Sequence, residues 1–283
     1  MKRNLFISLA GILAFSIANF ANAQNLFVAD YSGNVIGEIT PGGVQSTFAS
    51  GLSNPYGVAF NNTGNLFVSD DGSGNIYEYT PGGTRSTFAS VPYYAHGLAC
   101  DSAGDLFVTD YFGGRVIEIS PGGVQSTFAS GLSGPNFLAF DGAGNLFVSD
   151  YFGGDVTKLT AGGARSTIIS GLSLVDGVAV NNAGDVFVSV GSGSIFEITP
   201  SGVQSTFASG LAGADGMAFN AEGNLFVAGS GSGNIYEITS GGVQTTIATV
   251  FKELSVVAFQ PVPEPSVFGF LAIGAVALVM RRR

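Results

Sequence analysis

Six polar side chains recur at an almost constant spacing and could together bind a ligand or a cation. They are Tyr56, His96, Asn136, Asp176, Asp215 and Ser255, separated by 40, 40, 40, 39 and 40 residues. The segments around them are close copies of one another, yet the residue type at this position changes. Asn136, Asp176 and Asp215 would supply the oxygen ligands that Ca²⁺ or Mg²⁺ prefers. The alternative is a hydrated polar channel that holds no ligand.

A second group of candidate residues is aromatic and follows an acid. The phrase "NLFVSDYFGG" (145–154) is nearly repeated as "DLFVTDYFGG" (105–114) and begins "NLFVADYSG" (25–33). Tyr31, Tyr111 and Tyr151 therefore each follow an Asp. Tyrosine rings stack on the apolar faces of sugars, and carboxylates accept hydrogen bonds from sugar hydroxyls. We expect a ligand platform from these residues, although each Asp could instead cap the turn that follows it.

Both groups belong to a repeat of about 40 residues. "NLFV"-type segments begin at Asn25, Asn65, Asp105, Asn145, Asp185 and Asn224. The second repeat contains four short strand-like segments, "GVAF" (57–60), "NLFVSD" (65–70), "NIYEYT" (75–80) and "TRSTFAS" (84–90). Between such segments, "NNTG" places Gly64 where a hairpin needs a positive φ, and "TPGG" predicts a type II turn centred on Pro41 and Gly42. Four strands in such a period are typical of one β-propeller blade.

The segment count predicts six blades and the way in which the ring closes. The first repeat lacks its innermost strand, and a surplus "SVVAF" (255–259) follows the last repeat. We therefore predict an all-β, six-bladed propeller of four-stranded antiparallel blades over residues 24–260, closed by the C-terminal strand completing the N-terminal blade. In an antiparallel hairpin, the start of the innermost strand and the end of the second strand lie at the same end. Both candidate groups should thus converge at one mouth of the central channel.

Composition limits the possible partners. Residues 24–265 hold all 20 acidic residues and five of the ten basic residues, a net charge of −15. Such a surface repels phosphate backbones, so we expect no nucleic acid partner. Cys100 is the only cysteine, which excludes an internal disulfide, and we expect a buried apolar thiol. His96 is the only histidine, which excludes a zinc site built from several histidines.

Both ends of the chain are predicted to be sorting segments. Residues 1–23 combine Lys2 and Arg3, an apolar stretch and the sequence "ANA", which predicts a cleaved secretory signal peptide. Residues 261–283 contain an apolar run at 267–280 and end in three arginines. That run is shorter than the roughly 20 residues that span a bilayer comfortably. The arginines are expected to stay in the cytoplasm. A plain membrane tail is the alternative.

The pattern "PYGVAFNNTGNLFVSD" (55–70) resembles the NHL-type repeat, whereas the chain has no Trp and so lacks the "WD" dipeptide of WD40 arrays. Relatives in that six-bladed group include streptogramin lyases, gluconolactonase and many binding propellers. The resemblance implies a histidine base in the lyase branch, for which His96 is the candidate. It implies a divalent cation held by Glu, Asn and Asp in the gluconolactonase branch, where Asn136, Asp176 and Asp215 would serve without a Glu.

The sequence "VPEPS" (262–266), the apolar run and the basic end together resemble the PEP-CTERM sorting signal of Gram-negative bacteria. Its motif residues are Val262, Pro263, Glu264 and Pro265. The resemblance implies secretion, transient membrane anchoring by the tail, processing by an exosortase-type enzyme and a place at the cell surface or in the extracellular matrix. We therefore expect a non-catalytic binding or scaffold protein for an exopolysaccharide or another surface component. The alternative is a divalent-metal-dependent lactonase, another hydrolase or a lyase.

Overall fold

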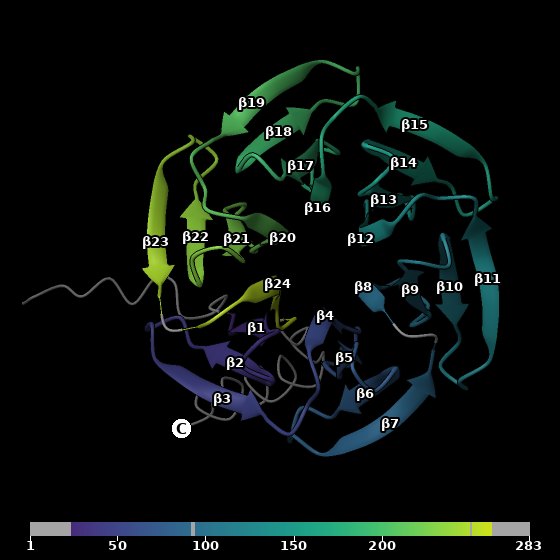
Figure 1. Cartoon of the computed structure of the whole chain (residues 1–283), viewed down its shortest axis with the longest axis vertical. Coiled ribbons are helices and arrows are strands. Elements are labelled where there is room, and N and C mark those ends of the chain that lie inside the picture. Colours follow the sequence, from purple (N-terminus) through teal and green to yellow (C-terminus); the bar gives the residue numbers. More distant parts are fainter. Residues whose placement is uncertain (1–23, 92–93, 250, 262–283) are drawn as a thin grey trace, which may run out of the picture.

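The computed structural model describes residues 24–91, 94–249 and 251–261, which form six four-stranded antiparallel sheets around a central axis (Figure 1). The innermost strands are β4 (Pro55–Phe60), β8 (Ala95–Cys100), β12 (Pro135–Phe140), β16 (Val175–Val180), β20 (Ala214–Phe219) and β24 (Leu254–Phe259). The prediction of an all-β, six-bladed propeller is confirmed. The predicted signal peptide (1–23) and the sorting motif (262–265) lie outside the described residues. Within the described ranges, no helix has the length and hydrophobicity needed to cross a membrane.

The other three positions of each blade are filled in chain order. The second strands are β1 (Leu26–Asp30), β5 (Leu66–Asp70), β9 (Leu106–Asp110), β13 (Leu146–Asp150), β17 (Val186–Val190) and β21 (Leu225–Gly229). The third strands are β2 (Val35–Ile39), β6 (Asn75–Tyr79), β10 (Arg115–Ile119), β14 (Asp155–Leu159), β18 (Ser194–Ile198) and β22 (Asn234–Ile238). The outermost strands are β3 (Gln45–Ala49), β7 (Arg85–Ser90), β11 (Gln125–Ser130), β15 (Arg165–Ile169), β19 (Gln204–Ala208) and β23 (Gln244–Ala248).

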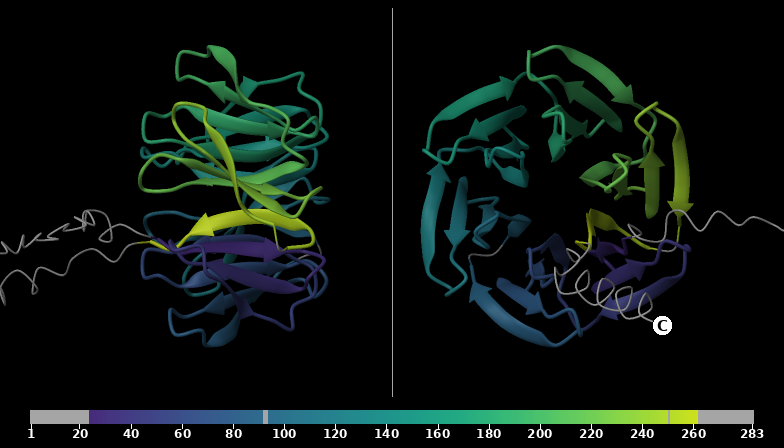
Figure 2. Two further views of the ribbon diagram at one scale, coloured as in Figure 1. Left: turned by 90° about the vertical axis from the view of Figure 1, so that its left-hand side faces the viewer. Right: turned by 180° about the vertical axis from the view of Figure 1, so that it is seen from behind.

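The ring closes within blade one, which takes its innermost strand from the C-terminal end of the propeller. Strand β24 pairs with β1 from Leu26 opposite Phe259 to Asp30 opposite Leu254, and the two strands lie side by side in Figure 2. This is the predicted closure. The first and last residues of the propeller meet on one face, where the Gln24 side-chain amide donates to the Gln260 carbonyl at 2.9 Å. The mouth, at Asp30 and Leu254, is at the opposite end of these strands.

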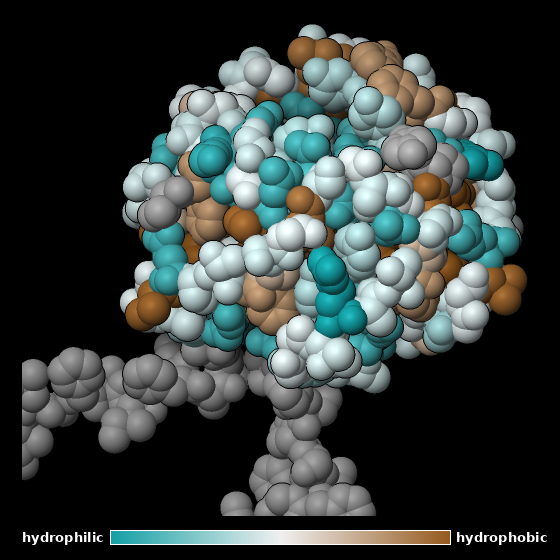
Figure 3. All heavy atoms as spheres, turned by 60° about the horizontal axis from the view of Figure 1, so that its bottom comes forward, coloured by the Kyte–Doolittle hydropathy of each residue, from teal (hydrophilic) through white to brown (hydrophobic). Residues whose placement is uncertain are grey.

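The core lies between neighbouring blades. Every residue of the second strands is buried because these strands are covered on both faces, and Leu66, Phe67 and Val68 are at most 3% exposed. A strand packed on both faces needs a continuous apolar run, which explains the repeated "LFV". The outermost strands instead begin with exposed Ser, Thr and Arg side chains, and the side of the molecule in Figure 3 shows hydrophobic residues interspersed with hydrophilic ones. Polar edge strands resist pairing with other chains.

The "TPGG" turns differ from the type II prediction, which is wrong. A type II turn needs a positive φ at Gly42, but the positive φ of 77° is at Gly43. The Gly43 amide donates to the Thr40 carbonyl at 2.8 Å, and the Thr40 amide donates to the Val44 carbonyl at 2.9 Å. This is the pattern of a type I turn followed by a left-handed glycine bulge, whose twist suits the flanking strands. The prediction for Gly64 is confirmed, with φ of 81°.

A β-bulge at the start of each innermost strand aims one side chain at the channel. In β4 the pairing with β5 shifts between Pro55 and Val58, so Tyr56 and Gly57 together face Ser69. The Ser69 hydroxyl accepts from the Gly57 amide at 2.7 Å and donates to the His96 carbonyl of the next blade at 2.8 Å. The fully buried hydroxyls of Thr109, Ser149 and Ser189 link the following blades in the same way. These four hydroxyls hold both the bulges and the blade contacts.

Two second strands lack this hydroxyl, with Ala29 in blade one and Ala228 in blade six, and adding it in blade six should stabilise the ring. Blade six has Ala228 at the equivalent position, where it faces β24. We expect Ala228→Ser to raise the free energy of unfolding by about 1 kcal/mol, the usual net value of a buried hydrogen bond. Chemical denaturation measures this, with Ala228→Cys as the control because a thiol of similar size bonds weakly. Equal stability of the Ser and Cys variants would contradict the role assigned to the hydroxyls.

Candidate functional site at the channel mouth

The six bulge residues predicted to converge do lie at one mouth of the channel, at the starts of the six innermost strands. Three of them are in contact, because the Tyr56 ring stacks on His96 and the Asn136 amide contacts the same imidazole. The sixth, Ser255, serves the backbone instead, because its hydroxyl donates to the Tyr56 carbonyl at 2.6 Å. Ser255 thereby links blade one to blade two, where Ala29 has no hydroxyl to offer.

His96 is held on all sides by protein groups. Its imidazole is stacked between the rings of Tyr56 and Tyr111, with centroids at 3.9 and 4.4 Å. Nδ1 lies 3.0 Å from the Asn136 amide oxygen. Nε2 lies 3.3 Å from Asp71 Oδ2, close enough for an ion pair but not aligned as a hydrogen bond. Both ring nitrogens are therefore engaged, which disfavours the role of a base acting directly on a substrate.

The aromatic side chains form a continuous array across the mouth of blades one to four. The ring centroids of Tyr56 and Tyr31 are 6.0 Å apart, and those of Tyr111 and Tyr151 are 6.1 Å apart. The outer members of the array are strongly exposed: Phe112 at 66%, Phe152 at 60% and Tyr94 at 45%. Blades five and six carry Gly and Ser at the corresponding turns (191–194 and 229–233). The aromatic side chains of the mouth are therefore gathered on the side of blades one to four.

The acids that end the second strands are structural. Asp70 accepts from the Ser53 amide, and Asp150 accepts from the amides of Ser133 and Gly153. Asp30 and Asp110 cap their turns in the same manner, and Asp110 also pairs with Arg115 at 2.8 Å. All four are at most 4% exposed. The hydrogen bonds therefore support turn capping, and not sugar binding, as the role of these carboxylates.

Two half-buried carboxyls face the array from blades five and six. Burial raises the pKa of Asp176 to about 7. Burial also raises the pKa of Asp215 well above its usual value, and the negative charges of Asp176 and Glu253 raise it further, while a hydrogen bond from the Gly216 amide opposes the shift. Asp215 Oδ1 is buried without a hydrogen-bond partner in the described part of the chain. Neither carboxyl forms an ion pair within the described part of the chain, so a positively charged group placed beside them would favour their ionised forms.

The two carboxyls also affect the pKa values of tyrosines in the aromatic array. Burial raises the pKa of Tyr56 well above its ordinary value, and the charges of Asp215 and then Asp176 add to the effect. Burial raises the pKa of Tyr151 as well, again with contributions from Asp176 and Asp215. Tyr56, Asp176 and Asp215 lie at the same mouth because they occupy the same bulge position of their innermost strands.

Asp71 is a site residue that the sequence reasoning missed. It occupies the turn position that is Tyr in three other blades, is 5% exposed, and has no hydrogen-bond partner for either carboxylate oxygen among the described residues. Its charge also contributes to raising the pKa of Tyr31 after burial itself. Aligning the residue after each strand-ending acid would have singled it out.

The predicted cation ligands supply too few oxygens for a calcium cage. Ca²⁺ takes six to eight oxygen ligands, whereas this trio offers two carboxylates and one amide oxygen that already contacts His96. In the part of the chain that the structure describes, no group of three or more His, Cys, Asp or Glu side chains is placed to hold a metal ion. We derive no chemistry through a metal, and metal binding by Asn136, Asp176 and Asp215 stays a prediction.

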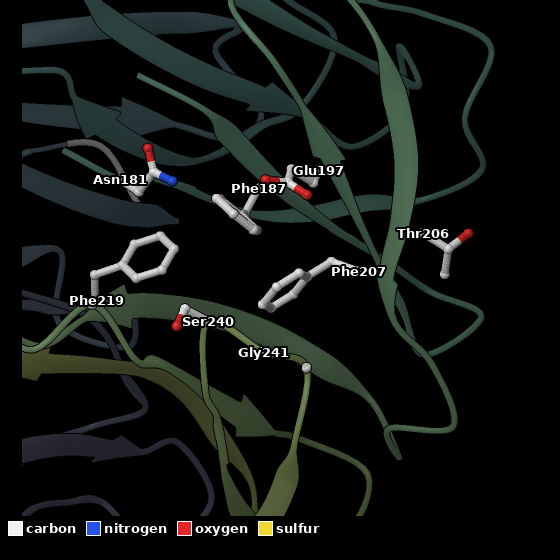
Figure 4. Close-up of a pocket in the computed structure, with 10 residues that line it drawn as sticks. Asn181, Phe187, Glu197, Thr206, Phe207, Phe219, Ser240 and Gly241 are labelled. Atoms are coloured by element: carbon white, nitrogen blue, oxygen red, sulfur yellow. The ribbon is translucent and has the colours of Figure 1, made fainter. Parts of the chain in front are cut away.

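Two other cavities are built by packing. A cleft of about 330 Å³ opens between blades five and six on the face opposite the mouth, where the rings of Phe187, Phe207 and Phe219 meet (Figure 4). The same trio of rings recurs between other blades as Phe27, Phe48 and Phe60 and as Phe107, Phe128 and Phe140, so we assign this cleft no ligand. The far end of the channel is apolar, and burial there raises the pKa of the Cys100 thiol to about 12.

The fold is that of a six-bladed β-propeller with an exposed aromatic array at one mouth of its channel. No protein-family model matches the sequence, and no curated protein is significantly similar to it. Among solved structures, a chain of a nidogen/laminin complex is similar, with a TM-score of 0.76, 16% identity and coverage of 84% of this chain and 99% of that one.

Two structures from the predicted group are also similar. Virginiamycin B lyase from Staphylococcus aureus gives a TM-score of 0.62 and 18% identity over 81% of this chain and 85% of that one. A putative gluconolactonase gives a TM-score of 0.65 and 18% identity, with coverage of 74% of this chain and 82% of that one. At these identities the likeness establishes the propeller fold and no activity.

Proposed function

We propose that this protein is an exported, surface- or matrix-sorted propeller that binds an exopolysaccharide at its channel mouth without catalysis. The carrying observation is the exposed aromatic array of Tyr94, Phe112 and Phe152 around the stacked Tyr111 and His96. Exposed apolar side chains that are contiguous usually mark a binding surface. Sugar rings offer apolar faces for stacking together with hydroxyls for nearby carboxylates.

The fold alone does not decide between binding and catalysis. Similar propellers occur in a complex of two proteins and in a lyase. The site favours binding because His96 has both nitrogens engaged and is only 8% exposed. The sorting signals predicted in residues 1–23 and 261–283 support delivery to the cell surface through secretion and exosortase-type processing.

A second candidate, the lactonase, hydrolase or lyase alternative, rests on one observation. A carboxyl with a pKa near neutrality, as for Asp176, is the kind of group that general acid–base catalysis uses. A screen of lactones and esters tests this candidate. Turnover that is abolished by Asp176→Asn would favour the enzyme over the binding protein.

Removing two rings of the platform should weaken polysaccharide binding while the fold survives. We expect Tyr111→Ala with Tyr151→Ala to lower affinity about thirtyfold, since each stacked ring contributes about 1 kcal/mol. Affinity electrophoresis in the polysaccharide of the producing cell measures this. The control is Val124→Ala with Val203→Ala, which truncates two valines 71% and 62% exposed on the opposite face. Equal retention of the two variants, with unchanged circular dichroism, would contradict the proposed site.

A further inference from the structure

The mouth contains two carboxyls, Asp176 and Asp215, that the binding of a neutral sugar leaves without a cationic partner. The described residues form three close ion pairs, His96 with Asp71, Arg115 with Asp110 and Lys158 with Asp141. None of these pairs includes Asp176 or Asp215. Buried charges without partners are costly, and proteins keep them where a ligand supplies the partner.

The surroundings of these carboxyls favour an organic cation over a metal ion. Asp176 and Asp215 share their bulge position with Tyr56, and Tyr111 and Tyr151 follow second strands that end at the same mouth. Aromatic faces attract ammonium groups. Rings are not ligands for Ca²⁺ or Mg²⁺, which require a shell of oxygen atoms. Tyrosines and carboxylates at one mouth therefore match a protonated amine.

The aromatic residues of the mouth differ in how far they are exposed. Tyr56, His96 and Phe137 stack in its floor, with Tyr56 and Phe137 centroids 5.4 Å apart, while Phe112 and Phe152 lie exposed at its rim. A sugar ring on the exposed aromatics could thus direct a substituent towards the carboxyls of blades five and six. An amino group on the ring would meet both kinds of contact at once.

From these contacts we infer that the ligand of the mouth is an amino sugar polymer, with free protonated amines read by Asp176 and Asp215 against the tyrosine rings. This inference rests on the proposed function, because it specifies the class of glycan. N-acetylation would remove the charge and add bulk, so the acetylated polymer should bind more weakly.

The experiment compares the binding of a glucosamine oligosaccharide with that of its N-acetylated counterpart of equal length. Isothermal titration calorimetry on the full chain measures both affinities. We expect the free amine form to bind at least about tenfold more tightly, equivalent to about 1.4 kcal/mol. Asp176→Asn with Asp215→Asn should abolish this preference. Glu197→Gln with Glu237→Gln removes the same formal charge from third strands away from the mouth and should leave the preference intact.

Each other outcome has a defined meaning. Equal binding of the two oligosaccharides would overturn the inference while leaving the proposed glycan function standing. A preference that survives the double Asp variant would also overturn it, because the acidic surface at large would then attract the amines. Binding of neither sugar would overturn the inference, and electrophoresis in the producing cell's polysaccharide would then decide the proposed function separately. Saturable calcium binding lost in the double Asp variant would assign the carboxyls to a metal and overturn the inference alone.

Discussion

A chain ending at Lys252 should lose the cooperative thermal unfolding of the intact propeller. The missing strand β24 buries Leu254, Val256 and Val257, which are 0%, 7% and 2% exposed. Burial of such side chains is worth about 2 kcal/mol each, so about 6 kcal/mol disappears before any hydrogen bond is counted. Whole domains have only about 5–15 kcal/mol of stability. Circular dichroism melts of the two chain lengths measure the effect.

The matched control ends at Pro261 and keeps the closing strand while removing the predicted sorting tail. It should melt like the full chain. The shorter chain also exposes both the edge of β1 and the Asp30 carboxylate, which accepts from the amides of Lys252 and Glu253 in the closed ring. A melting temperature of the shorter chain within a few degrees of the control would show that the ring does not depend on its closure.

Replacing Asp176 and Asp215 with asparagine should stabilise the protein at neutral pH and flatten its pH dependence. Both carboxyls have folded-state pKa values above the ordinary 3.8. The folded state therefore holds more protons than the unfolded state between about pH 4 and 7, and the free energy of unfolding falls as pH rises through that window. One pKa unit is worth about 1.4 kcal/mol. Because solvent at the mouth screens the charges, we expect a gain on the order of 2 kcal/mol at neutral pH.

Denaturation by urea at several pH values between 4 and 8 measures this difference. Asp141→Asn gives a control of opposite sign. Burial works against the Asp141 charge, but hydrogen bonds from Asn145 and Ala143 and the charge of Lys158 lower its pKa overall. Its loss should therefore destabilise the protein at neutral pH and matter little in acid. A double variant that is less stable than the parent at neutral pH would show that the carboxyl pair is structural.

The stability cost of this pair has a bearing on function. Sites that serve binding are often kept at the expense of stability. Asp176 and Asp215 have no ion-pair partner among the described residues. Their retention at the mouth is consistent with a ligand that supplies one.

The strands and their closure could be predicted because local patterns determine them. The "LFV" run needs burial on both faces, and the glycine turns need positive φ. The turn type was missed because two adjacent glycines leave open which one takes the left-handed conformation. The capping role of Asp70 and Asp150 and the sandwich around His96 depend on contacts between blades. Asp71 escaped notice because it stands among turn residues in the sequence, and its contact with His96 comes from the neighbouring blade.

The first and last residues of the propeller lie at one pole. Gln24 and Gln260 meet there, and the aromatic mouth is at the other pole. Under the proposed surface attachment, a copy held through either end would turn its mouth outward. Copies fixed side by side would present their mouths to one polymer strand simultaneously. The first contact then raises the effective concentration of the polymer at the next mouth. Many weak contacts would together give high avidity.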